Sequence, residues 1–261
     1  MQLCTLASGS EGNAALLIAP GALVLLDAGI SARRIVRALR ALGRSPEELD
    51  ALVLTHAHSD HISGADTLTR HYDLPVFATE GTALSLLRRA PAARETLHIV
   101  EPGTAFNIKE LSFTAIETPH DADGSVCYFF TDGRARAALV TDLGYVPEAI
   151  GVRLAALDAL ILEANHDPDR LWGGPYPYPL KRRIAGDEGH LSNGAAAEAA
   201  CRAVSGGARQ VVLAHLSREN NLPELAVGAV RSAAAELGAV AGRDFCLSVA
   251  PRFEACAPWE V

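Results

Sequence analysis

The segment 56–61 reads His-Ala-His-Ser-Asp-His and places three imidazoles and a carboxylate within six consecutive positions. It comes directly after the apolar run 51–54, which predicts a buried strand. Imidazole and carboxylate are ligands that divalent ions such as zinc or manganese accept. We expect His56 and His58 to point one way and Asp60 another, as two adjacent ions would require. The segment therefore predicts a metal site at the end of a strand, against the plainer alternative of a histidine-rich polar loop.

Length and composition predict one domain that spans residues 1–261. About half of the residues are hydrophobic, enough to build one substantial core. The chain has no apolar run long enough to cross a bilayer, and its first residues lack the pattern of a signal peptide. We therefore expect a cytoplasmic protein without membrane association. The oligomeric state cannot be read from the sequence.

The five cysteines are odd in number, widely scattered and never arranged as Cys-x-x-Cys. This pattern indicates neither a disulfide framework nor a cysteine-based zinc site. We expect them to be small buried hydrophobic residues. They are Cys4, Cys127, Cys201, Cys246 and Cys256.

The formal net charge of −8 argues against a broad, nonspecific nucleic-acid-binding surface, because phosphate contacts need clustered lysines and arginines. It does not exclude a nucleic-acid substrate. Two bound divalent cations would offset acidic charge where a phosphodiester binds, and Lys181 begins a run of three basic residues. A Gly/Pro/Tyr-rich stretch at 172–179 precedes this run and predicts a rigid irregular loop, whose aromatic residues either stack on bases or cover the sheet.

Strand-like and helix-like patterns alternate along the whole chain, which predicts a mixed α/β fold. Ser31, Ser45 and Ser192 each precede a predicted helix. Asp132-Gly133 reads as a hairpin turn, so some strand pairs must be antiparallel. The predicted strands are 16–18, 23–26, 52–54, 126–130, 137–140, 160–162 and 211–213.

The chain resembles the metallo-β-lactamase superfamily, and its YycJ/WalJ-like branch, from end to end. Besides the HxHxDH segment, seven motifs carry the resemblance: SGSEGN at 8–13, LDAG at 26–29, TDLGY at 141–145, EANHD at 163–167, GPYPYPLK at 174–181, GHLSN at 189–193 and AHLSRENN at 214–221. The resemblance implies the four-layer αββα metallo-β-lactamase sandwich. It also implies a metal-dependent phosphodiesterase, with DNA exonuclease activity in the 5′-to-3′ direction as the role of the branch.

The resemblance further implies two divalent metal ions, zinc or manganese, with ligands at several strand ends. The expected sets are His56, His58 and His120 for one ion, Asp60, His61 and His215 for the other, and Asp142 as the bridge. The proposed chemistry is attack on phosphorus by a hydroxide that bridges the two ions, with no covalent intermediate. His71 and His98 are expected at the surface.

Other residues are expected to support the reaction rather than bind metal. His190 resembles the histidine that superfamily phosphodiesterases hold near the scissile phosphate, where it would act with Asp60 in catalysis. The alternative is a loop histidine without a chemical role. Asp27 is expected to anchor the HxHxDH loop, and Glu163 is expected to orient a ligating histidine. His166 is expected to lie beside the site or to contact the substrate, as is Lys181. Ser192 and Asn193 are expected to form a seat for a phosphate.

Two other functions remain open at this point. The same dinuclear site could hydrolyse a small ester, thioester or cyclic phosphodiester, because fold and metal do not choose the substrate. A non-catalytic, metal-bound scaffold is the third alternative. Residue types suit zinc and manganese equally, and they do not separate DNA from RNA.

Overall fold

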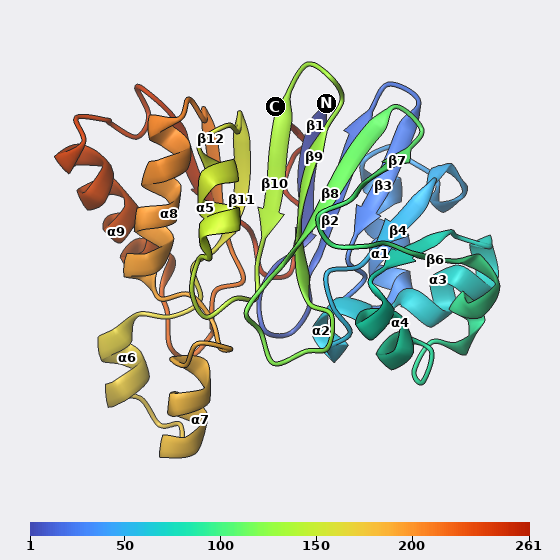
Figure 1. Cartoon of the computed structure of the whole chain (residues 1–261), viewed down its shortest axis with the longest axis horizontal. Helices are drawn as coiled ribbons and strands as arrows, with labels where there is room; N and C mark the ends of the chain where they lie inside the picture. The colour runs from blue at the N-terminus through green and yellow to red at the C-terminus, as the bar shows by residue number, and fades with distance from the viewer. The chain divides into compact units, whose positions relative to one another are not determined.

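A computed structural model describes all residues, 1–261, and divides them into two compact units. The first unit comprises Met1–Glu117, Ala122–Arg134 and Pro251–Glu260. The second comprises Thr118–Asp121, Ala135–Ala250 and Val261. Each unit combines strands with helices, as the alternation of sequence patterns predicts (Figure 1).

The first unit contains a seven-stranded mixed sheet in the order β14-β1-β2-β3-β4-β5-β6. The strands β1 to β3 pair antiparallel, and β3 to β6 pair parallel, with Leu26 opposite Val53. Parallel pairing brings the carboxyl ends of β3 and β4 to the same edge of the sheet. The strands are β1 (Gln2–Ala7), β2 (Ala14–Ala19), β3 (Ala22–Leu26), β4 (Ala51–Val53), β5 (Val76–Ala78), β6 (Leu97–Ile99) and β14 (Trp259–Glu260).

The same unit holds an antiparallel ladder of β7 (Ala105–Ile108), β8 (Leu111–Glu117) and β9 (Val126–Thr131). The hydroxyl of the fully buried Tyr128 on β9 donates to the carbonyl oxygen of Leu54 at 3.0 Å. This bond ties the ladder to the chain just after β4. The helices of the unit are α1 (Ala32–Ala41), α2 (Ser59–Ile62), α3 (Ala65–Tyr72) and α4 (Glu80–Leu86), with 3₁₀ turns at Pro46–Glu48 and Pro91–Thr96.

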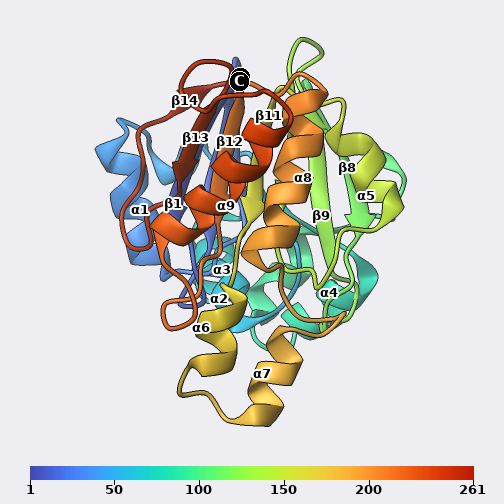
Figure 2. The ribbon, with the colours of Figure 1, turned by 90° about the vertical axis from the view of Figure 1, so that its left-hand side faces the viewer.

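The second unit is built on a parallel ladder of four strands. In register, Val140 lies opposite Leu162, and Leu162 lies opposite Leu213, so the strands end together. The helices α8 and α9 lie side by side in both ribbon views, whereas α6 and α7 extend beyond the strand ends (Figures 1 and 2). The elements are β10 (Arg136–Val140), β11 (Ala159–Glu163), β12 (Gln210–Ala214), β13 (Cys246–Val249), α5 (Glu148–Leu154), α6 (Pro168–Gly173), α7 (Tyr178–Ile184), α8 (Asn193–Ser205) and α9 (Pro223–Glu236).

Most local predictions from the sequence agree with these elements. All seven predicted strands overlap observed ones, and Asp132-Gly133 forms a turn in which the Asp132 carboxylate accepts from the Arg134 amide. Ser192 caps α8 by accepting from the Ala195 amide. After Ser45 the structure has only a single 3₁₀ turn instead of a helix.

The prediction of one irregular loop over 172–179 is wrong at both ends. Asp167 caps α6 by accepting from the Arg170 amide, with Pro168 at the first helical position. Pro177 precedes α7, which begins at Tyr178. Proline is compatible with the first turn of a helix, where its missing amide would bond to no carbonyl. Only 174–177 lies outside the two helices.

The cysteines are all free, which agrees with the absence of a predicted disulfide framework. Their expected burial holds for three of them, but Cys246 is exposed and Cys256 is partly buried. Cys246 lies on β13, the last strand of its ladder, where one neighbour is missing. No helix has both the length and the apolar character needed to cross a membrane.

Candidate metal centre

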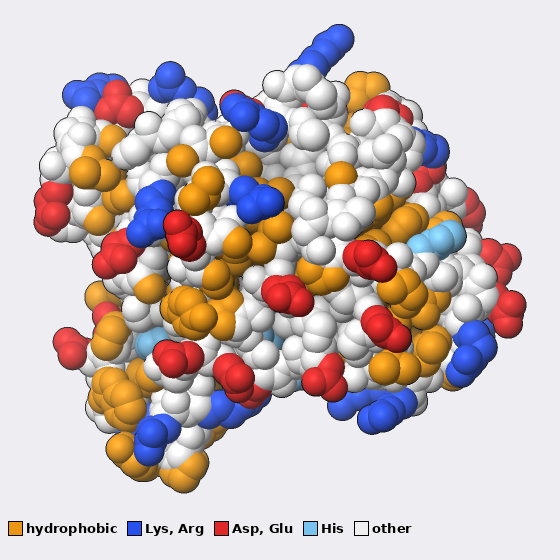
Figure 3. Space-filling view, viewed as in Figure 1, with side chains coloured by type: hydrophobic (Ala, Val, Ile, Leu, Met, Phe, Trp, Pro, Cys, Tyr) orange, Lys and Arg blue, Asp and Glu red, His pale blue; other side chains and the backbone are white.

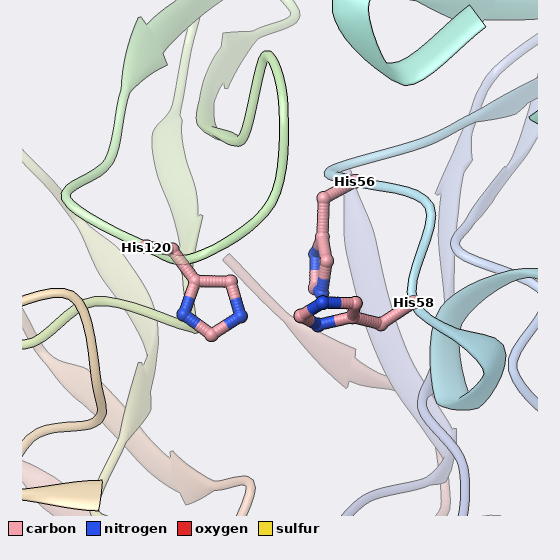
Figure 4. Close-up of side chains that lie close together, drawn as sticks. All are labelled: His56, His58 and His120. Atoms are coloured by element: carbon pink, nitrogen blue, oxygen red, sulfur yellow. The ribbon is translucent and has the colours of Figure 1, made fainter. Parts of the chain in front are cut away.

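The first histidine cluster lies where β4 ends in the first unit. Figure 4 shows His56 and His58 on the loop after β4 with their rings edge to face, and their centroids are 4.7 Å apart. The ring of His61 lies 4.1 Å from that of His56. His56 and His61 are fully buried. Three imidazoles are thus gathered by a segment of six residues, as its composition predicts.

The loop does not continue β4 as an extended strand. Its residues turn into the short helix α2, which begins at Ser59 and places Asp60 in its first turn. The different orientation of Asp60 therefore arises from a change of secondary structure after His58.

Asp27 follows β3 and supports this cluster. Its Oδ1 accepts from the Thr55 amide at 2.9 Å, and its Oδ2 accepts from the Thr55 hydroxyl at 2.9 Å. The same Oδ2 lies 2.8 Å from Nδ1 of His61, so Nδ1 carries the hydrogen and Nε2 keeps its lone pair. This is the anchoring geometry expected from the sequence, and it leaves the ring nitrogen that a metal needs on the opposite side.

The glycine-rich turn between β1 and β2 approaches the cluster through Asn13. The side-chain amide of Asn13 exchanges hydrogen bonds with the backbone of Gly9, and its Nδ2 lies 3.1 Å from Nε2 of His61. It also lies 3.4 Å from Oδ2 of Asp60. Gly29 packs so closely on this loop that a Cβ there would lie 1.6 Å from the carbonyl oxygen of Asp60. The turn therefore holds the position of Asp60 and His61.

The second cluster lies at the carboxyl ends of the parallel strands in the second unit. Asp142 follows β10, Glu163 ends β11 and His215 follows β12, while His190 comes from the loop before α8. Each of these four residues offers one ligand atom, and the four atoms lie within 4.8 Å of one another. The common end point of the strands is what brings together residues that are far apart in the sequence.

Glu163 is the centre of this cluster and is fully buried. Its Oε1 lies 2.8 Å from Nδ1 of His190 and 2.8 Å from Nδ1 of His215. Burial alone would raise the pKa of Glu163, but the charges and hydrogen bonds of the two histidines outweigh it and hold the pKa below its ordinary value. The carboxylate is thus ionised and directs the Nε2 atoms of both rings away from itself.

The two histidines that share Glu163 differ in exposure. The side chain of His215 is 3% exposed, and that of His190 is 18% exposed. His215 therefore has the burial expected of a ligand, whereas His190 can meet a molecule that arrives from solvent.

His120 belongs to the second unit and lies on the loop after β8, where Figure 4 labels it. Its Nδ1 lies 3.2 Å from the carbonyl oxygen of Gly189, which accepts the ring hydrogen. Its Nε2 lies 4.0 Å from Oδ1 of Asp142, and its ring centroid lies 5.2 Å from that of His190. The loop thus adds a third imidazole to the second cluster.

Three of the predicted site residues adopt a left-handed backbone conformation. The φ angles are 58° at Asp27, 60° at Asp142 and 54° at His215, and each residue lies just after a strand. This conformation costs about 1 kcal/mol or more for a residue with a Cβ, although aspartate tolerates it best. Strain repeated at three strand ends is typical of functional sites.

His166 and the start of α8 lie beside this cluster. His166 is 3% exposed, and its Nδ1 has no hydrogen-bond partner. Its burial lowers the pKa to about 4, so the ring is neutral near pH 7. The amides of Asn193 and Asn221 form two reciprocal hydrogen bonds of 2.9 and 2.8 Å. The side chain of Asn193, which was expected in a phosphate seat, is therefore held by the side chain of Asn221.

Lys181 does not present its charge at the surface as expected. It is 9% exposed, and its Nζ donates to the carbonyl oxygens of Trp172 and Gly174, both at 2.7 Å. A run of three basic residues suggests a solvated face, but the orientation of α7 turns the first of them towards the end of α6. His71 and His98 are exposed, as expected.

Two residues near the site were not found from the sequence. Asn165 donates from Nδ2 to the carbonyl oxygen of His215 at 3.0 Å, and so holds the backbone of a predicted ligand. Arg183 donates to Asp121, the neighbour of His120, at 2.5 Å. Asn165 lies within the EANHD motif, which is a signal that could have found it. Nothing in the sequence pairs Arg183 with Asp121.

The donor set in each unit fits divalent metal ions. Both clusters combine imidazole nitrogens with aspartate oxygens, which zinc and manganese accept. In the first, Nε2 of His61 lies 3.6 Å from Oδ2 of Asp60, and the second gathers Asp142 with His190 and His215. Both also pair a histidine Nδ1 with a buried carboxylate, the arrangement that commonly orients a ligating imidazole.

Comparison with known proteins matches a family model, described as a beta-lactamase superfamily domain, to residues 23–216. Exodeoxyribonuclease WalJ of Streptococcus pneumoniae is 36% identical over 245 residues, which cover 92% of this chain and 90% of WalJ. Exodeoxyribonuclease YycJ of Bacillus anthracis is 33% identical over 248 residues, or 94% of this chain and 93% of YycJ.

The fold also has solved counterparts. The metallo-beta-lactamase fold protein YhfI of Bacillus subtilis aligns with a TM-score of 0.73 at 16% identity, covering 98% of this chain and 99% of YhfI. Together with two mixed sheets and flanking helices, this likeness confirms the fold class expected from the sequence. Because the family model covers most of the chain and full-length relatives share a third of its residues, the chain belongs to the beta-lactamase superfamily, in the branch of WalJ and YycJ.

Proposed function

We propose that the protein is a metal-dependent exonuclease that hydrolyses the phosphodiester bonds of DNA, in the 5′-to-3′ direction by resemblance. The observation that carries this proposal is the pair of hydrogen bonds that Glu163 accepts from His190 and His215. One buried carboxylate there orients an inner imidazole suited to a metal and an outer imidazole suited to a substrate. The names of the full-length relatives, both exodeoxyribonucleases, support DNA as the substrate. DNA as substrate is in turn consistent with a cytoplasmic protein.

We propose, by resemblance, that the protein holds two divalent ions and that residues 1–261 act as a single domain. His56, His58 and His120 would hold one ion, Asp60, His61 and His215 the other, and Asp142 would bridge them. Zinc and manganese are the two candidates. When bound, the ions would activate water and neutralise the charge that develops on the phosphoryl group.

His190 is the residue proposed to act on the leaving group. Its Nδ1 is engaged by Glu163, so its Nε2 is the atom that can donate a proton to the departing oxygen. Glu163 keeps the ring in one tautomer and stabilises it when it is protonated. The backbone amides at the start of α8, a helix of 13 residues, lie next in the chain after His190 and add positive potential for a phosphate.

The test combines a metal measurement with a nuclease assay. Wild type and Asp142→Ala are loaded with manganese or zinc, and bound metal is counted by elemental analysis. End-labelled DNA and RNA, single- and double-stranded, are then incubated with each protein. We expect about two ions per wild-type chain, fewer in the variant, and end-directed loss of DNA by wild type alone.

The outcomes separate the alternatives. Degradation of RNA without degradation of DNA would support a nuclease whose substrate is RNA instead of DNA. Hydrolysis of bis(p-nitrophenyl) phosphate without cleavage of any polymer would favour a small-substrate hydrolase. Bound metal without any hydrolysis would favour the scaffold.

A further inference from the structure

Two aromatic side chains are exposed on the hairpin formed by α6 and α7. Trp172 is 47% exposed and Tyr178 is 66% exposed, although both are large and partly apolar. Their ring centroids lie 6.1 Å apart with the planes inclined by 45°. Figure 3 shows hydrophobic side chains gathered over this part of the molecule, at the lower left. Exposed aromatic rings that share a small surface usually indicate a binding function.

The hairpin is held in one conformation by buried polar contacts. The two hydrogen bonds from Lys181 tie the first turns of α7 to the end of α6, where carbonyl oxygens lack helical partners. A Cβ at Gly174 would lie 2.6 Å from the carbonyl oxygen of Arg170, so the chain turns tightly as it leaves α6. The backbone that carries Trp172 and Tyr178 is therefore held in place before any partner binds, which lowers the entropic cost of binding.

The charge of the hairpin is opposite to that of the whole chain. The hairpin, residues 168–184, includes four basic residues and one acidic residue, Asp169, in a chain with a formal net charge of −8. Arg182 and Arg183 are exposed on α7, beside the aromatic rings in the sequence. A local positive charge next to exposed rings suits a partner that carries both negative charges and flat unsaturated groups.

The hairpin is connected directly to the proposed catalytic histidine. The amide of His190 donates to the carbonyl oxygen of Ile184, the last residue of α7, at 2.9 Å. Gly189 packs on the same turn, because a Cβ there would lie 2.2 Å from that oxygen. A chain bound along α7 is thereby led towards His190.

We propose that the α6–α7 hairpin is a stacking platform for the unpaired bases of a single-stranded nucleic-acid end. Trp172 and Tyr178 stack on the bases, and Arg182 contacts the phosphates. The inference rests on the proposed function, because it specifies the form in which that substrate is bound. Base stacking is tolerant of sequence, as an exonuclease needs.

The experiment uses the fluorescence of Trp172 in the full-length protein. The chain has two tryptophans, so Trp259→Phe leaves Trp172 as the only one. This variant is titrated, in EDTA to prevent cleavage, with a short oligothymidylate, with blunt duplex DNA and with dextran sulfate. Affinity is measured in parallel from the anisotropy of a fluorescein-labelled oligothymidylate. We expect oligothymidylate to quench Trp172, and the other two polymers to leave its emission nearly unchanged.

Substitutions separate the contribution of base stacking to binding from the contribution of charge. Tyr178→Ala should weaken oligothymidylate binding about tenfold or more, and Tyr178→Phe should restore it, since stacking contributes about 1–3 kcal/mol per base. Arg182→Ala should reduce the salt dependence by roughly 0.7 in the logarithmic slope. Phe253→Ala, which removes an aromatic side chain that is 50% exposed in the first unit, is the matched control and should change neither quantity.

The inference and the proposed function can fail separately. Hydrolysis of bis(p-nitrophenyl) phosphate, which carries no nucleobase, by the metal-loaded protein reports on the catalytic centre, and the control Phe253→Ala should leave it unchanged. If the protein degrades DNA but Tyr178→Ala binds oligothymidylate within twofold of wild type, the stacking platform is overturned alone. Equal quenching by dextran sulfate would also overturn it. If Trp172 responds as expected but no phosphodiester is hydrolysed, the proposed exonuclease is overturned and the platform stands.

Discussion

Each of the two histidine clusters depends on one buried carboxylate, but the two carboxylates carry different numbers of partners. In the first unit, Asp27 orients a single histidine, His61. In the second unit, one oxygen of Glu163 orients both His190 and His215. A shared carboxylate couples a predicted metal ligand to a predicted proton donor. The second cluster therefore depends more on one residue than the first does.

The remaining hydrogen bonds enlarge this difference. The other oxygen of Glu163 accepts from the backbone amides of Leu143 and Leu191, at 3.3 and 3.0 Å. All four donors are N–H groups, two of the backbone and two of the histidine rings. None of them can act as an acceptor while the rings keep this tautomer. Asp27 has three donors, and one of them is the hydroxyl of Thr55, which can accept as well as donate. An amide in place of the carboxylate is thus harder to accommodate at 163 than at 27.

Glu163→Gln should have the largest effect of the substitutions that follow from this comparison. An amide has only one acceptor oxygen, so either the two histidines or the two backbone amides are left without an acceptor. We expect metal affinity and hydrolysis of bis(p-nitrophenyl) phosphate to fall by about 100-fold, the upper range for a residue that orients a ligand. Metal titration and steady-state kinetics measure the two effects.

The control for this prediction is Glu198→Gln, which removes the same charge from the exposed face of α8. Circular dichroism of both variants reports whether they fold. A folded Glu163→Gln protein with wild-type metal affinity and turnover would show that the shared carboxylate does not matter.

The two clusters also differ in how far the sequence could predict them. Residues 56–61 are contiguous, so residue types alone indicated the first cluster, and the preceding strand pattern indicated its location. The second cluster gathers Asp142, Glu163 and His215 from three strands. Its formation depends on a register that brings the strand ends together, and only the family resemblance pointed to it.

Other features depended on geometry that a sequence does not display. Lys181 belongs to a charged run, but the two carbonyl oxygens that bind it come from the end of another helix. Asn193 was expected in a phosphate seat because of its type and its place before a helix. Its side-chain amide instead donates to that of Asn221, which lies 28 residues further along the chain. The left-handed conformation of His215 could not be predicted, because only a few per cent of residues other than glycine adopt it and the sequence does not mark which ones do. Strand and helix patterns, in contrast, depend on local periodicity and were mostly predicted correctly.

A second prediction concerns the free energy of unfolding, which should fall at acidic pH because of His166, beside the second cluster. Its folded pKa is about 4, lowered chiefly by burial, whereas an unfolded histidine has a pKa of about 6.5. Between these values the unfolded chain binds the proton and the folded chain does not, so stability falls as pH drops from about 6.5 to about 4. Between pH 7 and 5, wild type should therefore lose about 2 kcal/mol of unfolding free energy that His166→Asn keeps.

Urea unfolding at both pH values, with a chelator present, measures this difference. The lowered pKa of Glu163 does not interfere, because its stabilisation is lost only as pH falls below the range of ordinary carboxylates. His71→Asn replaces an exposed histidine of the first unit and should behave like wild type. Parallel losses in all three proteins would contradict the prediction.

Asp27→Asn should have the smallest effect, because the first cluster keeps most of its hydrogen bonds. Asparagine tolerates the left-handed conformation of position 27, so the backbone is not disturbed. If the amide oxygen accepts from His61, only the bond from the Thr55 amide is lost, and we expect metal affinity to fall by about tenfold. A loss equal to that of Glu163→Gln would remove the proposed difference between the two clusters, whereas a clearly smaller one would establish that a shared carboxylate makes the second cluster the more vulnerable.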